Sequence, residues 1–562
     1  MATCARHILE EIPVMQLAET LLAEIQKQAE SLSIDLITEL AITLNASLLA
    51  ITRIHNTLSP INNLPPDVLG LIFQLVPDAP YTRAAYYYGK AFMHPPWSPS
   101  CVNPAPYVKL SHVCRLWRHL ALDLPSLWAN IVQSPFVAGA VPTDVLLRRS
   151  RSAPLNVYWT GYPGEALTAL FSSQDAQRIR SIWWEGNEAI LYPEDLGFPA
   201  PSIESLTLLG VDRIFHKRVR MAPIFDAQAL RIRYLSLRGM LWLPANDMHS
   251  LTQLQLASYE SPGLSSDILS VLERTPNLVD LVLSRNRDTS VQFDSRLVSL
   301  PKLRRIVFQH RLDDIGIAAV LTHLEVPDST ALRLRYFMPY KVENLIKLSR
   351  SPVVRTATKV FITQDSNVCE VVAVGPASGV DIITELCDRD DTVGFAPLFA
   401  MLYAELPLLQ IRELWIVERE GAFLPLSGQY NRFVPMLRQM RNLEKLLVME
   451  ENLHRIIDAL LAPTDSSRLP LFRRNMTVHI IVQLPDVDMG ALTGVVVRLA
   501  EIGVMRLVIA YHRQYTGPRF DHAFLGCLFE SVLEVALGTK ELSNMHNELP
   551  PALTDLYIVR DM

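Results

Sequence analysis

The segment SHVCRLWRH contains two histidines and a cysteine, which are residue types that ligate zinc. If the segment is one helix, His112 and Cys114 point about 200° apart, and His112 and His119 are about 10.5 Å apart along the axis. Zinc–ligand bonds are only about 2 Å long, so these side chains cannot share one ion. We therefore expect no metal here, and we expect Cys114 to be a small buried side chain rather than a reactive thiol.

Two further groups of residues could bind charged ligands. The acidic run Asp388–Asp391 could hold a cation, but neighbouring carboxylates in a polar loop usually stay hydrated. The basic cluster Arg213–Arg220, with Arg148–Arg151, could touch phosphate or an acidic partner. The net charge of −6 gives no electrostatic reason to expect nucleic acid, so we interpret both basic stretches as solvated or salt-bridged faces.

The sequence contains no known catalytic motif. It has no GxSxG, no phosphate-binding glycine loop, no GxGxxG and no HExxH. An unrecognised site within Cys369–Gly394 is the remaining enzymatic alternative, but no nucleophile, base and orienting group occur together there. We predict that the chain is not an enzyme and that it needs no cofactor.

Composition and cysteine usage indicate the compartment. The six cysteines are scattered without CxxC spacing, which favours a reducing environment. The N-terminus lacks a basic stretch followed by a long apolar run, and charges interrupt the later apolar stretches. We expect a soluble intracellular protein of the cytosol, the nucleus or both, with no membrane partner.

Residues 1–58 are expected to form one long helix or a helix pair. Between Pro13 and Pro60 there is no glycine or proline, and apolar residues recur in steps of three and four. Flanking charge is sparser than is usual in a two-stranded coiled coil. This favours packing against the rest of the chain and leaves self-association open.

Three helical elements follow in residues 59–133. Pro65 and Pro66 predict a helix start, because proline is tolerated only in the first turn, and Asp67 suits the positive end of the helix dipole. The segment VKLSHVCRLWRHLALDL predicts a second amphipathic helix, and DLPSLWANI predicts a third short turn or helix. Between the first two lies a Pro- and Tyr-rich insertion, 77–107, which we interpret as a loop excursion.

The phrases LPPDVLGLIF, LSHVCRLWRHLA and LPSLW, in this order, resemble the F-box, a helical module that docks onto the Skp1 adaptor of cullin-based ubiquitin ligases. The lead-in LSPINNLPPDVL, the insertion and the later RRSRSAPLNVYW resemble the large F-box-like families of mushroom-forming fungi. The insertion is longer than the usual link in the F-box family. Loop closure costs only about 0.6 kcal/mol per doubling of length, so it weakens the resemblance without excluding it, although it could block the adaptor surface.

The resemblance implies a set of adaptor-binding residues. Among these we expect Leu64, Pro65, Leu69 and Ile72 to lie at the adaptor surface, whereas Trp117 and Trp128 hold the helices together. The full set that matches the motif is Leu64, Pro65, Val68, Leu69, Ile72, Phe73, Val113, Cys114, Trp117, Leu127 and Trp128.

Residues 134–562 contain a recurring phrase of alternating apolar residues. Its first six occurrences begin at 203, 232, 251, 278, 303 and 321, with separations mostly typical of leucine-rich repeats. Ile268, Leu269 and Leu272 have helical spacing between two phrases, so the unit is predicted to be strand then helix. The Asn or Cys that usually follows the strand is absent, which predicts an irregular curve.

The predicted fold class is α/β: an N-terminal helical segment and an F-box-like three-helix module, followed by an irregular leucine-rich-repeat-like solenoid with a parallel sheet. The resemblance implies a non-catalytic substrate receptor that binds a Skp1-like adaptor, and through it a cullin, while the repeats bind a protein target. The alternative is a repeat scaffold without a ligase role, in which the helices only cap the solenoid.

Overall fold

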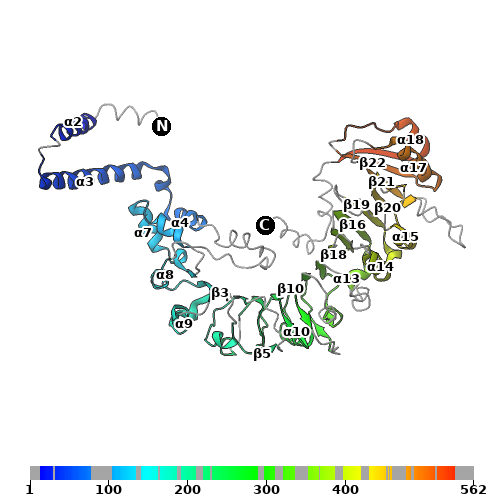
Figure 1. Ribbon diagram of the computed structural model, residues 1–562, viewed down its shortest axis with the longest axis horizontal. Helices are drawn as coiled ribbons and strands as arrows, with labels where there is room; N and C mark the ends of the chain where they lie inside the picture. The colour runs from blue at the N-terminus through cyan, green and yellow to red at the C-terminus, as the bar shows by residue number, and fades with distance from the viewer. Residues whose placement is uncertain are drawn as a thin grey trace. The chain divides into compact units, whose positions relative to one another are not determined.

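The computed structural model (Figure 1) contains two compact units. The first comprises the described residues of Met1–Asp78 and Pro104–Leu127, and the second those of Trp128–Met562. The division after Leu127 falls inside the range 59–133 that the sequence predicts as one module. The structure describes residues 13–28, 32–76, 104–133, 141–161, 165–186, 191–210, 219–227, 231–288, 296–309, 320–335, 352–365, 368–385, 396–418, 430–450, 453–454, 456–457, 476–482, 487–512 and 515–537.

The first unit consists of helices. Its elements are α2 (Pro13–Lys27), α3 (Ile34–Leu58), the 3-10 turn η1 (Pro60–Asn63), α4 (Pro66–Leu75), α6 (Ala105–Leu110) and α7 (Arg115–Asp123). A second 3-10 turn, η3 (Pro125–Trp128), follows where the third short element was predicted. The N-terminal region is thus a helix pair, and α4 begins at the proline pair as expected. Most of the insertion 77–107 lies outside the described residues.

The helix α3 differs from the sequence expectation in its packing. No residue of α3 is buried, so its predicted packing against the rest of the chain is not observed among the described residues. By length and composition alone, Ile34–Leu58 could also cross a membrane, with a mean hydropathy of 1.6 over its most apolar window. Asp35, Glu39 and Arg53 nevertheless divide this helix, so the expectation that charges interrupt the apolar stretches stays a prediction here.

The predicted second helix is in fact two helices, α6 and α7, separated at Ser111–Cys114. Cys114 adopts an extended backbone conformation, and its Sγ accepts a hydrogen bond from the Trp117 backbone N–H at 3.5 Å. This is the geometry of an N-terminal cap, which satisfies one of the free N–H groups of the first turn. The Val-Cys-x-x-Trp phrase therefore marks a helix start, and Cys114 is half-buried rather than buried.

The described residues of the second unit form one large, mostly parallel sheet of 17 strands. Neighbouring strands pair in the order β1 (Asn130–Gln133), β2 (Leu155–Thr160), β3 (Ile179–Glu185), β4 (Ser205–Leu209), β6 (Tyr234–Arg238), β8 (Gln253–Ala257), β10 (Asp280–Ser284), β13 (Arg305–Gln309), β15 (Ala331–Arg335), β18 (Gly379–Glu385), β17 (Val368–Val374), β16 (Lys359–Asp365), β19 (Glu413–Glu418), β20 (Lys445–Met449), β21 (Thr477–Val482), β22 (Arg506–His512) and β23 (Ser531–Leu537).

The strand order reverses in the middle of this sheet. The strand β15 pairs in parallel with β18 rather than with β16, the next long strand in the chain. The strand β17 is antiparallel to both of its neighbours, β16 and β18, and the parallel order resumes where β16 pairs with β19. The sheet is therefore mixed at this point, which the sequence expectation of a parallel sheet did not include.

One face of the sheet carries the core. A continuous cross-strand row of large apolar side chains, almost fully buried, runs through Leu208, Leu237, Leu256, Leu283, Phe308 and Leu334. Strands β4, β6, β8, β10 and β13 lie at the first five predicted phrases. The sixth phrase, Leu321–Val326, instead contains the short β14 (Leu324–Glu325), and the long strand of that repeat is β15.

Helices and short strands complete the unit. Figure 1 shows α14 and α15 along one side of the strands β16, β19 and β20. The helices are α8 (Thr143–Ser150), α9 (Glu165–Phe171), α10 (Leu264–Glu273), α13 (Pro352–Arg355), α14 (Ala396–Glu405), α15 (Tyr430–Gln439), α17 (Met489–Glu501) and α18 (His522–Leu528), and the short 3-10 turns are η4 (Gln174–Arg178), η5 (Pro193–Leu196), η6 (Phe225–Ala227) and η8 (Leu408–Gln410). The short parallel pairs are β5 (Arg220–Ala222) with β7 (Trp242–Pro244), β9 (Glu260–Ser261) with β11 (Arg287–Asp288), and β12 (Val298–Ser299) with β14.

Buried polar side chains join successive repeats. Asn286, two residues after β10, accepts a hydrogen bond from the Tyr259 N–H and donates one to the Leu256 carbonyl, both in the preceding repeat. Asp288 accepts hydrogen bonds from the Gly263 and Ser265 N–H groups at the start of α10. The expectation that no asparagine follows the strand is thus wrong for β10, where Asn286 satisfies backbone groups that would otherwise be buried unpaired.

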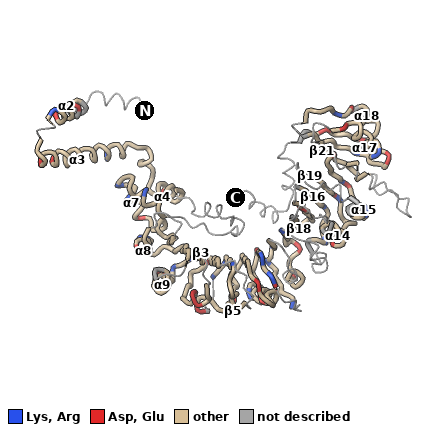
Figure 2. Tube along the Cα trace, in the orientation of Figure 1, with Lys and Arg blue, Asp and Glu red and all other residues tan. Residues whose placement is uncertain are grey.

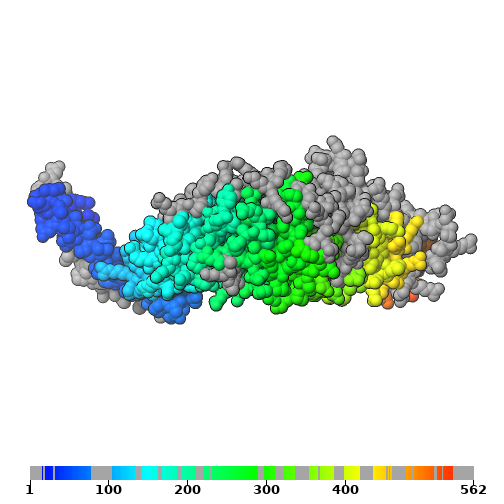
Figure 3. Space-filling view, turned by 90° about the horizontal axis from the view of Figure 1, so that it is seen from below, coloured from blue at the N-terminus to red at the C-terminus, as the bar shows by residue number. Residues whose placement is uncertain are grey.

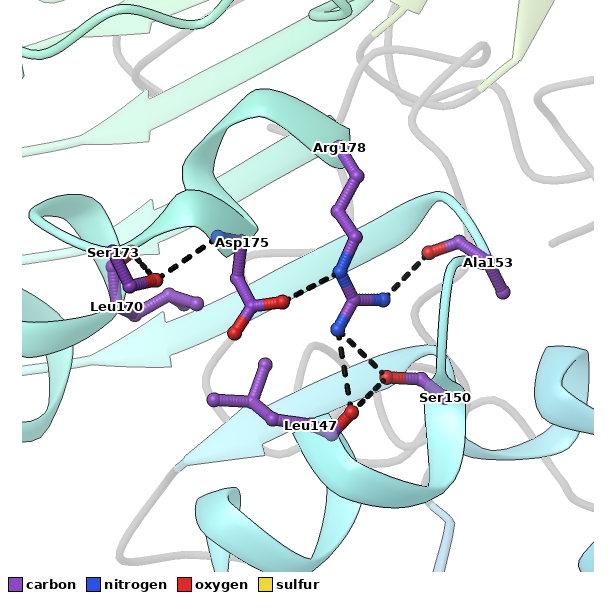
Figure 4. A network of polar contacts seen from close by, with 7 residues as sticks. All are labelled: Leu147, Ser150, Ala153, Leu170, Ser173, Asp175 and Arg178. Carbon is purple, nitrogen blue, oxygen red and sulfur yellow. Dashed lines mark hydrogen bonds and ion pairs between the residues drawn. The ribbon is translucent and has the colours of Figure 1, made fainter.

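A second polar network fixes the segment between α8 and β2 (Figure 4). The guanidinium group of Arg178 donates to the Asp175 carboxylate, to the Ala153 carbonyl, and to the hydroxyl of Ser150 and the carbonyl of Leu147. The last two groups belong to the final turn of α8, whose carbonyls have no partner within the helix. Arg178 therefore caps the C-terminal end of α8 and is hydrogen-bonded to the loop that leads into β2.

Two glycines provide a matched test of packing in the second unit. A Cβ at Gly210 would lie 2.5 Å from the Gly239 carbonyl oxygen, whereas a Cβ at Gly494 in α17 would meet nothing within 4 Å. We expect Gly210→Ala to lower the free energy of unfolding by about 1–3 kcal/mol, because the backbone must shift. Gly494→Ala should raise it by about 0.5–1 kcal/mol through helix propensity. Denaturant titration of the two variants checks this, and equal effects would contradict the close approach.

Candidate functional site

The helix α4 carries apolar side chains on two faces. On the inner face Leu69 and Phe73 are fully buried, and a Cβ at Gly70 would lie 3.1 Å from the Leu124 side chain, so this face packs within the helical unit. On the outer face Leu71 and Leu75 are 62% and 83% exposed. Water-exposed leucines at this spacing on a short helix are typical of a surface that binds a partner.

The indole ring of Trp117 holds the small unit together. It lies 5.0 Å from the Phe73 ring, centroid to centroid, and its Nε1 donates a hydrogen bond of 2.6 Å to the Asn62 side chain. Asn62 in turn donates to the Asn56 carbonyl near the end of α3. Asn62, which is not among the residues that match the F-box motif, thus links α3, η1 and α7.

The structure sorts the predicted adaptor-binding residues by exposure. Exposed are Leu64, Pro65, Val68 and Val113; half-buried are Ile72, Cys114 and Trp117; buried are Leu69, Phe73, Leu127 and Trp128. The expected surface position of Leu69 does not fit its full burial, which follows from its place on the inner face of α4. The predicted packing role of Trp117 fits its contact with Phe73, whereas Trp128 belongs to the second unit, where the Arg149 guanidinium lies 4.4 Å from its ring centroid. Adaptor binding by the set as a whole stays a prediction.

Sequence reasoning missed three exposed leucines, namely Leu71, Leu75 and Leu116. A signal for two of them was present, because Val68, Leu71 and Leu75 follow one another at steps of three and four. We call Leu64, Val68, Leu71 and Leu75, which are contributed by the segment from the end of η1 to the end of α4, the α4 outer face.

The chemistry of this region is that of an apolar contact. Tyr107 of α6 is buried, and burial raises the pKa of its phenol to about 12, which keeps it neutral. Among the described residues, no group of three or more His, Cys, Asp or Glu side chains could hold a metal ion. His119 contacts Asp123 at 3.7 Å as an exposed pair one helical turn apart. The acidic run Asp388–Asp391, which the sequence indicates to be a hydrated loop, and most of the basic cluster Arg213–Arg220 lie outside the described residues.

The sheet face opposite the core has apolar clusters in two places. One consists of Val132, Tyr158, Trp183 and Leu209, and the other of Val417, Leu447, Met449, Ile481 and Ala510 with Trp415 packed against it. Between them this face is mixed: Val282 and Val307 are buried, whereas Ser236 and Gln255 are hydrogen-bonded to each other at 2.9 Å. Figure 2 shows that charged residues occur along the chain of this unit without one sign dominating.

His479 on this face predicts a pH dependence of stability. Burial, together with the nearby Lys445 charge, lowers the pKa of its imidazole from 6.5 to about 4. The unfolded chain therefore binds the proton more readily between pH 6.5 and 4, and stability falls as the pH falls through this window. Because the side chain is partly exposed, we expect a loss of about 1–2 kcal/mol between pH 7.5 and pH 4.5. Denaturation of wild type and His479→Leu at both pH values checks this, and the same loss in the variant would contradict it.

A comparison with protein families gives one match, the F-box-like family, over residues 61–134. No match to the chain is found among curated proteins. The matched range contains η1, α4, α6, α7 and η3, which are the elements that carry the inner and outer faces described above. Residues 61–134 of this chain therefore form an F-box-like domain.

Proposed function

We propose that this protein is a non-catalytic substrate-receptor subunit of a Skp1–cullin–F-box type ubiquitin ligase. F-box-like domains typically bind Skp1-like adaptors, which supports the adaptor role. The observation that carries the proposal is the α4 outer face, because the inner face of α4 is already filled by Leu69 and Phe73. Within the described part of this unit the outer leucines are largely exposed, and they are therefore available to a partner.

The second unit is the proposed receptor for the target protein. Its strands repeat in near-register over a long sheet, and short strands and helices recur between them, which supports an irregular leucine-rich-repeat-like solenoid. Such an array offers an extended surface, and its role is to bring a bound target close to a charged conjugating enzyme. Proximity of this kind raises effective concentration without chemistry by the receptor.

Location and origin are part of the same proposal. A ligase of this type acts in the cytosol or nucleus, without nucleic acid or membrane as a partner. The lead-in before Pro65, the long insertion and the segment after the domain are what support an origin in a mushroom-forming fungus.

The alternative is a repeat scaffold without a ligase role. It is favoured by the position of β1, which follows η3 directly and pairs only with β2 among the described strands. A solenoid needs a cap at such a terminal strand, and helices that precede it in the chain could serve as one.

Co-expression of the full chain with a Skp1 homologue from a basidiomycete, followed by size-exclusion chromatography, separates the two functions. The receptor function predicts that both proteins elute together as a complex. Elution of the folded chain alone, with circular dichroism unchanged, would favour the scaffold.

A further inference from the structure

The helix α3 exposes apolar side chains along its whole length. Ile34, Ile51 and Leu58 are 74%, 60% and 74% exposed, and no residue of the helix is buried. The face of α3 seen in Figure 3, drawn in dark blue, is open to solvent. This surface is separate from the α4 outer face and has no role in the proposed adaptor contact.

Eight of the exposed residues follow a heptad pattern, and the exposed Leu36, Ile42, Leu49 and Ile54 lie outside it. Steps of three and four alternate without a break along one seam, which is the spacing of a coiled coil. Thr38, Asn45 and Thr52 flank the seam at every seventh residue and keep one side polar. The seam consists of Ile34, Ile37, Ala41, Leu44, Leu48, Ile51, His55 and Leu58.

A bilayer is a poor partner for this helix. Glu39 and Arg53 bound its uncharged part, so only the 13 residues 40–52 are free of charge. These span about 20 Å, whereas the hydrocarbon core of a bilayer is about 30 Å thick. Polar residues, among them Thr38, Thr43, Ser47 and Thr52, recur along the helix rather than only at its two ends, which suits a partner in water.

We propose that α3 pairs with α3 of a second copy of this chain, antiparallel and centred on Ala46. In this register each seam residue of one copy faces the residue of the other copy that lies equally far on the other side of Ala46, so the numbers of two facing residues add to 92. Every contact therefore occurs twice, once in each direction. A twofold axis requires such self-complementarity. The four distinct layers are Ile34 with Leu58, Ile37 with His55, Ala41 with Ile51, and Leu44 with Leu48.

Side-chain size and charge favour the antiparallel orientation. The small Ala41 faces the large Ile51, whereas a parallel pair would place Ala41 against Ala41 and leave a gap. A parallel pair would also place His55 against His55 and the acidic first turns side by side. In the antiparallel pair Asp35 and Glu39 of each copy lie at the level of Arg53 and His55 of the other, and Figure 2 shows little other charge on α3.

The threonine side chains beside the seam of α3 are compatible with burial in such a dimer interface. The hydroxyls of Thr38 and Thr52 donate to the carbonyls of Ile34 and Leu48, so they need no water partner. Twenty-five residues give a seam about 37 Å long, and closing it buries on the order of 600 Å² per copy. That area is near the lower limit for specific interfaces, so the expected dimer is a weak one that depends on concentration.

The test is the mass of the full chain in solution between about 1 and 50 µM, measured by light scattering after size exclusion. Wild type should shift from 63.3 kDa to twice this mass as the concentration rises. Leu44→Asp with Leu48→Asp removes the central layer and should stay monomeric. Ala46→Asp with Ala50→Asp adds the same charge on the opposite side of the helix and should dimerise like wild type. A monomeric wild type at 50 µM, or loss of the dimer in both variants, would overturn the proposal.

Cysteine cross-linking tests the register. Ile37→Cys and His55→Cys variants, mixed and oxidised, should form a covalent dimer beyond the wild-type background, whereas either variant alone should not. Cross-linking of each variant with itself would overturn the antiparallel arrangement. Flotation of wild type with phosphatidylcholine–phosphatidylserine vesicles is expected to be absent, and its presence would identify a bilayer as the partner. None of these results depends on whether a Skp1-like adaptor binds.

Discussion

Replacing Leu71 and Leu75 together by aspartate is expected to weaken binding to a Skp1-like adaptor at least 100-fold. Both side chains are mostly exposed on the α4 outer face, so the change does not disturb the core of the helical unit. Burial of a leucine contributes about 1.5–3 kcal/mol, and two of them correspond to two or more orders of magnitude in affinity. The introduced carboxylates add a desolvation cost in the same direction. Isothermal titration calorimetry with the purified adaptor measures the change.

The matched control uses two leucines that are equally exposed in the second unit. Leu297 and Leu409 are 73% and 57% exposed, and Leu297→Asp with Leu409→Asp adds the same charge to the chain. This control should bind the adaptor like wild type. Equal weakening by both double variants would mean that net charge rather than the α4 outer face decides binding, whereas wild-type affinity of the Leu71 and Leu75 variant would place the adaptor elsewhere.

The helices of the F-box-like domain could be located from sequence because their signals are local. The proline pair fixes the start of α4, and the apolar spacing that follows defines a helix. The split between α6 and α7 was missed because it depends on a sulfur atom, that of Cys114, acting as the cap. The inner and outer faces of α4 could not be told apart either, because Val68, Leu69, Leu71 and Leu75 are all apolar, and only the packing of Phe73 against Trp117 decides which side is buried.

The sheet could be predicted from sequence only where the order of the strands in the sheet follows their order in the chain. From β4 to β13 the next long strand in the chain is also the next strand in the sheet, so a repeated phrase is sufficient to place it. From β15 to β19 the two orders differ. The apolar sequence Val368–Val374 predicts a strand but does not indicate whether the neighbouring strands are parallel or antiparallel to it. The choice depends on contacts between residues far apart in sequence, among which a buried ion pair is prominent.

That ion pair, between Arg333 of β15 and Asp381 of β18, predicts the second large effect. The Arg333 Nε donates to the Asp381 carboxylate at 2.6 Å, and the two side chains are 1% and 0% exposed. They face each other in the strand register at the point where the strand order reverses. Removing one partner takes this ion-pair contact from a charge that stays buried, so Arg333→Met and Asp381→Leu should each cost about 3–5 kcal/mol.

The double variant Arg333→Met with Asp381→Leu is expected to be more stable than either single variant, because it removes both buried charges at once. Hydrogen exchange of the β15 and β18 amides reports the local stability, even if the whole chain does not unfold in two states. The control is the exposed pair Arg180 and Glu204, with 3.0 Å between Nη2 and Oε2, whose loss should cost less than about 1 kcal/mol. If the double variant loses as much protection as the two single variants combined, the pair does not act as a unit. Recovery in the double variant would mean that the two charges act as a unit and that an apolar pair can replace them between β15 and β18.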